Sequence, residues 1–296
     1  MTAARAALVW LVALGSACAS SAGNAPAPNF ATKVAPAAPS KAAVSLDTLL
    51  GRTPEEGSVL LRLSVARQHP LGGLIVPFVL AWPGWGATIA SITSQPLTDL
   101  EWIDVVGPKD PTHERMVMRT AAPDEAMDAR LQMRSDGSLR VVERGQPHLI
   151  AALPPDGAQA TLQSLRSARV AEPDDSDADE ALHVDFPNPH GVMLYVPANV
   201  RRAVVRADSR PGGAAEGFAD LTFDDDATAT RMAGELKARA ESMNNVVVRV
   251  LTRDLLGGLV IAAEGPVVKL SLPATRGQLE SLATLASAML PGRGKH

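Results

Sequence analysis

Two histidines and an aspartate lie close together in the second half of the chain and are of the types that bind metal ions. His183, Asp185 and His190 are near neighbours in the sequence, and imidazole and carboxylate groups are the usual ligands of zinc and similar ions. In a strand, His183 and Asp185 would share a face, while the Pro-Asn-Pro segment 187–189 would carry His190 around a turn. The alternative is that His183 and Asp185 are simply neighbours on one face of a strand and that His190 lies in the following loop, with no metal ion bound. The three residues are therefore weak metal candidates, and we expect no cofactor.

An acidic stretch just before them has the beginning of a calcium-binding loop but not its end. Asp175, Asp177 and Asp179 alternate as the first carboxylates of an EF-hand loop do. Glu180 stands where that loop needs glycine, and Phe186 stands where it needs a bidentate glutamate. The stretch 172–180 is therefore expected to be a solvated acidic linker.

The sequence contains none of the most distinctive catalytic or nucleotide-binding motifs. It has no Walker loop, no G-x-S-x-G elbow, no H-E-x-x-H and no G-x-G-x-x-G. The formal charge of -4 argues against binding to a phosphate backbone. Aromatic residues make up only 3% of the chain, too few for base-stacking or sugar-binding clefts to be a first guess. We expect no catalysis by this chain and no nucleic-acid partner.

Cys18 is the single cysteine of the chain, and its surroundings indicate covalent modification. Arg5, the apolar run 6–14 and the small residues that follow have the order of an export signal. The sequence Leu-Gly-Ser-Ala-Cys at 14–18 resembles a bacterial lipobox, although glycine occupies the place three residues before the cysteine where leucine is usual. Cleavage after Ala19 would instead discard the cysteine with the signal. We expect lipidation, because an unpaired thiol in an oxidising compartment otherwise has no explanation.

Cys18 sets the expected organisation of the N-terminal part. Residues 1–17 are the expected signal peptide, and 18–45 form an Ala- and Pro-rich tether with too little apolar bulk to fold. Its prolines favour extended conformations that would hold a folded body away from the membrane. With alanine after the cysteine, the resemblance to bacterial lipoproteins implies sorting to the outer membrane. The expected location is therefore the periplasm, with the lipid on Cys18 as the link to the membrane.

Two segments further along the chain match each other. Residues 137–155 and 257–274 each read as a strand, a glycine-containing turn, a second strand and a Leu-Pro stop. Asp156 and Thr275 then follow as predicted N-caps, each with glutamine three residues later in capping-box spacing. The match predicts an internal repeat, and chance similarity between Ala- and Leu-rich segments is the alternative.

The match leads to a predicted α+β fold of two tandem, duplicated units. The first unit spans 46–171 and the second 181–291, followed by a tail at 292–296, and each is expected to be a mainly antiparallel sheet with helices on one face. The composition, 46% hydrophobic and 20% charged, suits such a folded protein. Helical periodicity in the second unit predicts helices over 224–243 and 277–290.

The segment 71–92 is the most apolar stretch after the export signal and carries no charge. Its apolar spacing predicts a short helix broken near Pro83, and its prolines and glycines argue against a membrane span. Burial between the two units is one interpretation. A surface for a partner or an apolar ligand is the other, and on that interpretation Phe78, Trp82 and Trp85 form the candidate contact surface.

Three loose motifs give the first unit a family resemblance. With HPLG at 69–72, PGW at 83–85 and PLTDLEW at 96–102, it resembles uncharacterised predicted lipoproteins of high-GC Gram-negative bacteria. The resemblance implies an envelope location and carries over no activity or catalytic residue. The predicted function is a lipid-anchored periplasmic protein that binds or scaffolds an unknown protein or apolar ligand. The alternatives are an enzyme with a dispersed, metal-dependent site and a carrier of an apolar molecule.

Overall fold

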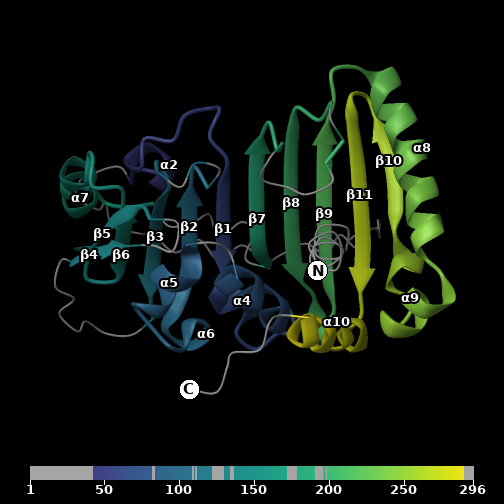
Figure 1. The fold of residues 1–296 in the computed structure, drawn as a ribbon, viewed down its shortest axis with the longest axis horizontal. Helices are drawn as coiled ribbons and strands as arrows, with labels where there is room; N and C mark the ends of the chain where they lie inside the picture. The colour runs from purple at the N-terminus through teal and green to yellow at the C-terminus, as the bar shows by residue number, and fades with distance from the viewer. Residues whose placement is uncertain are drawn as a thin grey trace, which may run out of the picture.

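Eleven strands lie side by side in one open sheet that crosses the whole molecule (Figure 1). The structure is a computed structural model, and it describes residues 43–81, 84–108, 110, 112–121, 130–133, 137–171, 179–190, 196–197 and 199–289, without the side chains of 78–81, 130 and 286–289. The strand order is β10-β11-β9-β8-β7-β1-β2-β3-β6-β5-β4, and every neighbouring pair is antiparallel. The strands are β1 (Ser58–Arg62), β2 (Leu100–Val106), β3 (Arg115–Thr120), β4 (Arg130–Met133), β5 (Leu139–Gln146), β6 (Leu149–Leu153), β7 (Glu180–Pro187), β8 (Arg202–Ser209), β9 (Ala215–Thr222), β10 (Val260–Glu264) and β11 (Val267–Ala274).

Helices cover parts of both faces of this sheet. They are α2 (Leu46–Leu49), α3 (Leu63–Ala66), α4 (Gly72–Ala81), α5 (Trp85–Ala90), α6 (Pro96–Asp99), α7 (Ala158–Ser167), α8 (Asp226–Met243), α9 (Val246–Leu251) and α10 (Arg276–Met289), with short 3-10 turns η2 (Pro211–Gly213) and η3 (Leu255–Gly258). None of the helices in the described part of the chain combines the length and the apolar character needed to cross a bilayer.

The first half of the sheet consists of β1 to β6 and the second half of β7 to β11. One face of the sheet, called the α4 face below, is covered by helices over both halves. Over the first half, Leu61 and Ile103 lie in a buried cluster with side chains from α3, α4 and α5. Over the second half, Met232 of α8 packs with alternate residues of β8, β9 and β11, and Leu282 of α10 joins the first cluster. The main core therefore runs the length of the sheet on this face.

The opposite face, called the α7 face, has a different cover in each half. Over β2, β3 and β6, side chains such as Val117 and Ala151 pack with α2 and α7. Over β8, β9 and β11, side chains such as Arg206, Phe218 and Lys269 belong to none of the three hydrophobic clusters. These three strands alternate between buried and more exposed positions, as strands with one solvated face do.

Several predicted helix boundaries are confirmed. α8 begins after Asp225, whose Oδ1 accepts from the backbone N–H of Thr228 at 2.7 Å. The capping box before α10 is present, because the N–H of Thr275 donates to Gln278 Oε1 at 2.8 Å. The prediction of Asp156 as an N-cap is wrong: Gly157 takes that place at φ 77°, a conformation that glycine adopts without strain, and no side chain caps α7.

The apolar segment 71–92 folds as two helices with a break between them. α4 ends at Ala81 and α5 begins at Trp85, which confirms the predicted interruption near Pro83. Leu74 and Ile75 are buried in the cluster on the α4 face. This part of the segment is core.

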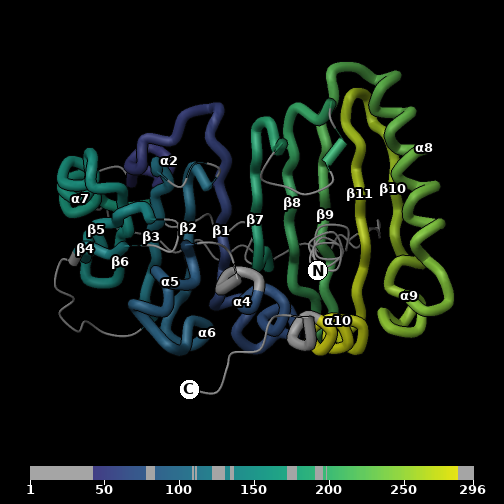
Figure 2. Tube along the Cα trace, viewed as in Figure 1, coloured from purple at the N-terminus to yellow at the C-terminus, as the bar shows by residue number. Residues whose placement is uncertain are grey.

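The α+β class and the antiparallel strands are confirmed, but the two predicted units do not have separate sheets. β1 pairs with β7, from Ser58 opposite Asp185 to Leu61 opposite Leu182, so strands distant in the sequence lie together (Figure 2). This pairing satisfies backbone groups that two open edges would leave exposed.

The expectation of helices on one face is wrong for the first half, where α2 and α7 cover one face and α3, α4 and α5 the other. The reason is visible in β6. All of its residues are buried, and a strand buried on both faces needs cover on both faces of the sheet. Of the expected linker, 172–178 lies outside the described residues, whereas Glu180 is the buried first residue of β7.

Candidate functional site

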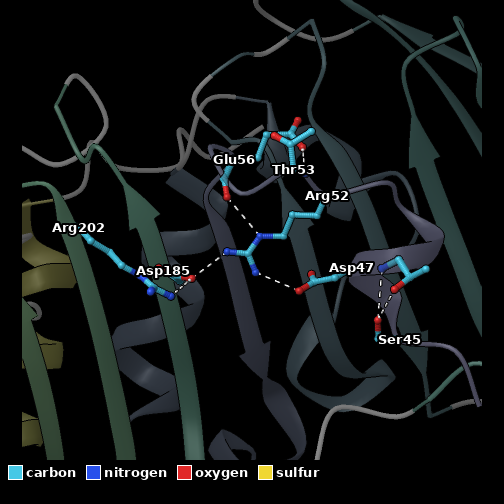
Figure 3. Close-up of polar contacts among 8 residues, drawn as sticks. Ser45, Asp47, Arg52, Thr53, Glu56, Asp185 and Arg202 are labelled. Atoms are coloured by element: carbon cyan, nitrogen blue, oxygen red, sulfur yellow. Dashed lines mark hydrogen bonds and ion pairs between the residues drawn. The ribbon is translucent and has the colours of Figure 1, made fainter.

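Charged side chains from five parts of the chain meet on the α7 face where the two halves of the sheet join (Figure 3). We call Asp47, Arg52, Asp104, Asp185 and Arg202 the junction cluster. Asp47 comes from α2, Arg52 from the loop after it, Asp104 from β2, Asp185 from β7 and Arg202 from the start of β8.

Local structure before β1 brings Arg52 to this place. Ser45 caps α2, because its Oγ accepts from the N–H of Thr48 at 3.3 Å. The chain then turns at Gly51, which has φ 64°, the left-handed conformation that commonly ends a helix. The guanidinium of Arg52 points from this turn toward β7 (Figure 3).

Arg52 connects three separate acceptors. Its Nε donates to the carbonyl oxygen of Glu56 at 3.2 Å, its Nη1 to Asp47 Oδ2 at 3.1 Å, and its Nη2 to Asp185 Oδ2 at 2.9 Å. Arg202 holds the same aspartate in bidentate fashion, with Nε 2.8 Å from Oδ1 and Nη2 2.9 Å from Oδ2. Two guanidinium groups thus share one carboxylate, an arrangement of strong charge-assisted hydrogen bonds.

The two buried aspartates of the cluster have opposite electrostatic properties. Burial opposes the ionisation of Asp185, but the hydrogen bonds from Arg202 and Arg52 outweigh it and lower the pKa of this carboxyl. Burial raises the pKa of Asp104 to about 7, and the charge of Asp47 acts in the same direction, while Arg52 and His183 partly offset it. Asp185 is therefore an anion at neutral pH, and Asp104 changes its charge near neutral pH.

The structure does not bring the predicted metal candidates together. His183 and Asp185 do share a face of β7, but Asp185 is held by the two arginines, and His183 Nδ1 lies 3.2 Å from Glu180 Oε2. His190 follows a turn in which Asn188 has φ 53°. The described part of the chain contains no group of three or more His, Cys, Asp or Glu side chains that could share a metal ion.

Trp85 of the predicted contact surface is fully buried, so it offers no exposed contact in this structure. Its indole Nε1 donates to Glu114 Oε2 at 2.7 Å, and Glu114 is itself buried, which explains why the polar edge of the ring lies inside. Phe78 lies in α4, but its side chain, like the whole of Trp82 and Cys18, is outside the described residues.

A second polar surface, which was not predicted from the sequence, lies on the α7 face of β8, β9 and β11. We call it the open strand face, and its members are Val204, Arg206, Asp208, Glu216, Phe218, Asp220, Thr222, Lys269 and Ser271. The signal for it was present, since RAVVRADS at 202–209 and AEGFADLT at 215–222 place larger or polar side chains at alternate positions.

Charges of both signs are fixed on the open strand face. Arg210 Nη2 lies 3.1 Å from Asp208 Oδ2 and 2.8 Å from Glu216 Oε2. The guanidinium of Arg206 lies 5.0 Å from the centre of the Phe218 ring, within cation-π range. Burial raises the pKa of Asp208, and Arg210 and Arg206 counteract that rise. The surface is thus a pre-arranged mixture of acidic, basic and aromatic groups.

Comparison with solved structures finds only distant similarity of fold. No protein-family model matches the chain, and no curated protein matches it. Crystal form I of TP0453, a Treponema protein, resembles it with a TM-score of 0.43 and 12% sequence identity, over 83% of this chain and 99% of that chain. A similarity of this degree assigns neither a family nor a function.

Proposed function

We propose that this chain is an exported, lipid-anchored protein that binds a partner protein through the open strand face and has no catalysis of its own. The observation that carries the proposal is the difference between the two halves of the α7 face. On this face helices α2 and α7 bury β2, β3 and β6, whereas β8, β9 and β11 present alternate charged and aromatic side chains that no hydrophobic cluster includes. Among the described residues, β8, β9 and β11 therefore keep a side-chain face without a helix cover, and this face is available for recognition.

The character of the open strand face fits a protein better than a small molecule. Arg206 and Phe218 are of residue types that are enriched at protein interfaces. Asp220 and Lys269 lie opposite each other on β9 and β11, so charges of both signs are interspersed. Such a pattern selects a partner by electrostatic complementarity.

The junction cluster supports a structural role rather than an enzymatic one. Both oxygens of Asp185 accept hydrogen bonds from arginines, and His183 faces Glu180. A general base or a metal ligand needs a free lone pair directed at substrate or metal. These contacts favour a binding protein over a metal-dependent enzyme.

Site-specific photocrosslinking in cells tests the proposed binding face. A photoreactive phenylalanine analogue replaces Phe218 in one variant and Ser271 in another, and the matched control carries it at Lys237, which is exposed on α8. We expect a discrete protein adduct from positions 218 and 271, absent at 237 and reduced by Arg206→Glu. Absence of an adduct at both face positions, or the same adduct at 237, would overturn the proposal.

We also infer that the two halves are tandem copies of one pattern. In support, the order β1-β2-β3-β6-β5 in the first half parallels β7-β8-β9-β11-β10 in the second. The matching strands bury opposite faces, however. Leu149 and Leu153 face α7, while the aligned Val268 and Leu272 lie on the α4 face. An experimental structure in which these five strands superpose pairwise would support the inference, and a different order would overturn it.

A further inference from the structure

Four aliphatic side chains project into solvent from the short helix α9. Val246, Val247, Val250 and Leu251 are 76%, 66%, 72% and 50% exposed. We call these four residues the α9 patch. Their spacing places them on one side of the helix, while Thr252 at its end is 3% exposed and faces inward. Isolated exposed apolar residues are ordinary, but a contiguous group on one helix side marks a contact surface.

The local sequence does not favour this conformation. Four of the six residues of α9 are valine, whose branched side chain lowers helix propensity and favours strands. The helix depends on its ends, where Asn245 Oδ1 accepts from the N–H of Val248 at 3.0 Å and Thr252 Oγ1 donates to Val248 O at 2.7 Å. An exposed apolar segment that favours strands lowers the solubility of a protein. A binding surface that covers this helix in the functional protein would explain why the sequence keeps it.

The charge around the α9 patch suits an anionic surface. Between residues 237 and 254 the charged side chains are Lys237, Arg239, Arg249 and Arg253 against Glu241 and Asp254. Arg249 is paired with Asp254, with 3.1 Å between Nε and Oδ1, and the remaining charges leave this region net basic in a chain whose formal charge is -4. Aliphatic residues bordered by cations are typical of elements that lie on anionic lipid.

We propose that the α9 patch rests on a phospholipid bilayer and inserts its valines at the headgroup boundary. The inference builds on the proposed lipid anchor, since a chain held at Cys18 meets a bilayer constantly. The segment between Cys18 and Ala43, if extended at roughly 3.1 Å per residue, reaches about 75 Å, enough to let α9 touch the same membrane.

A fluorescence experiment on the full chain tests this contact without the anchor. Cys18→Ser removes the single thiol, and Val247→Cys then carries an environment-sensitive dye on the patch. The matched control carries the dye at Lys269→Cys on the open strand face, in the same Cys18→Ser background. With vesicles of phosphatidylglycerol and phosphatidylcholine, we expect a blue shift at 247 and none at 269. Val250→Asp should weaken the apparent binding about tenfold, because it removes apolar contact and adds an anion.

The alternative outcomes are distinct. No shift at 247, or equal shifts at 247 and 269, would overturn the contact, because the second result places vesicle binding elsewhere in the chain. A shift at 247 that grows with protein concentration and needs no vesicles would assign the patch to a second copy of the chain. Since the anchor is absent throughout, none of these results bears on the lipid at Cys18 or on the partner of the open strand face.

Discussion

Arg52 and Asp185 are 133 residues apart in the sequence, and their side chains meet at 2.9 Å between Nη2 and Oδ2. This contact fastens the loop before β1 to β7, the first strand of the second half. Arg202 from β8 binds the same carboxylate. Three segments of the chain therefore depend on one aspartate.

Removing the charge of Asp185 should destabilise the protein more than removing an exposed ion pair does. Asp185→Asn leaves two guanidinium groups without their shared anion, and we expect a loss of about 2 to 3 kcal/mol in the free energy of unfolding. Arg201→Gln is the control, because the side chains of Arg201 and Asp224 are 69% and 53% exposed, and it should cost much less, since solvent screens an exposed ion pair. Urea denaturation measures both. Equal losses would contradict a stabilising junction.

The same contact predicts sensitivity to acid. The pKa of Asp185 is lowered in the folded state, mainly because hydrogen bonds from its arginines outweigh burial. Its contribution to stability is therefore present above the unfolded pKa of about 4 and lost as the pH falls through the lower folded value. Wild-type and Asp185→Asn stabilities should converge in acid, and a constant difference would contradict the assigned direction.

Asp104 should have the opposite effect on stability. Its pKa is raised by burial to about 7, so between about pH 4 and 7 the folded state keeps a proton that the unfolded state has lost. The free energy of unfolding then falls as the pH rises through this window. Asp104→Asn should remove the slope and be more stable than wild type at pH 8 by as much as about 4 kcal/mol. Parallel curves for the two proteins would contradict the raised pKa.

Features written locally in the sequence were predictable, whereas those set by strand pairing were not. The Thr275 capping box and the helix after Asp225 depend on neighbouring residues alone. The pairing of β1 with β7 could not be predicted in this way. The alternation of apolar residues shows which side chains share a face of a strand, but it does not determine which other strand lies beside it. Arg52 and Asp104 were missed for the same reason, since only that pairing places them beside Asp185.

The acidic linker can be used to test the continuous sheet. Protease sites are expected within 172–178, because the sequence there is polar and acidic. After cleavage we expect the two fragments to elute together from a sizing column and to separate only in denaturant. β1 and β7 hold them by backbone pairing, and Leu74 of α4 and Leu282 of α10 share one cluster. Fragments that separate in buffer would contradict the single sheet.

Trp85 should contribute to stability in two separable ways. Trp85→Ala removes a fully buried indole and should cost about 3 to 5 kcal/mol. Trp85→Phe keeps much of the apolar volume but deletes the donor to Glu114, and it should cost about 1 to 3 kcal/mol. Leu131→Ala is the control, because Leu131 is 68% exposed. Thermal unfolding would contradict the buried hydrogen bond if Trp85→Phe matched this control.

Cys18→Ser should release the protein from the membrane fraction. The apolar run 6–14 is much shorter than the roughly 20 residues that a spanning helix needs, and the tether has neither a basic cluster nor an amphipathic face. A carbonate wash removes proteins held only by surface contacts, so contact through the α9 patch cannot retain the variant during this test. Wild-type protein should stay in the pellet and the serine variant should appear in the supernatant. If the serine variant remains in the washed pellet, the chain is anchored at another place and the lipid at Cys18 is not its link to the membrane.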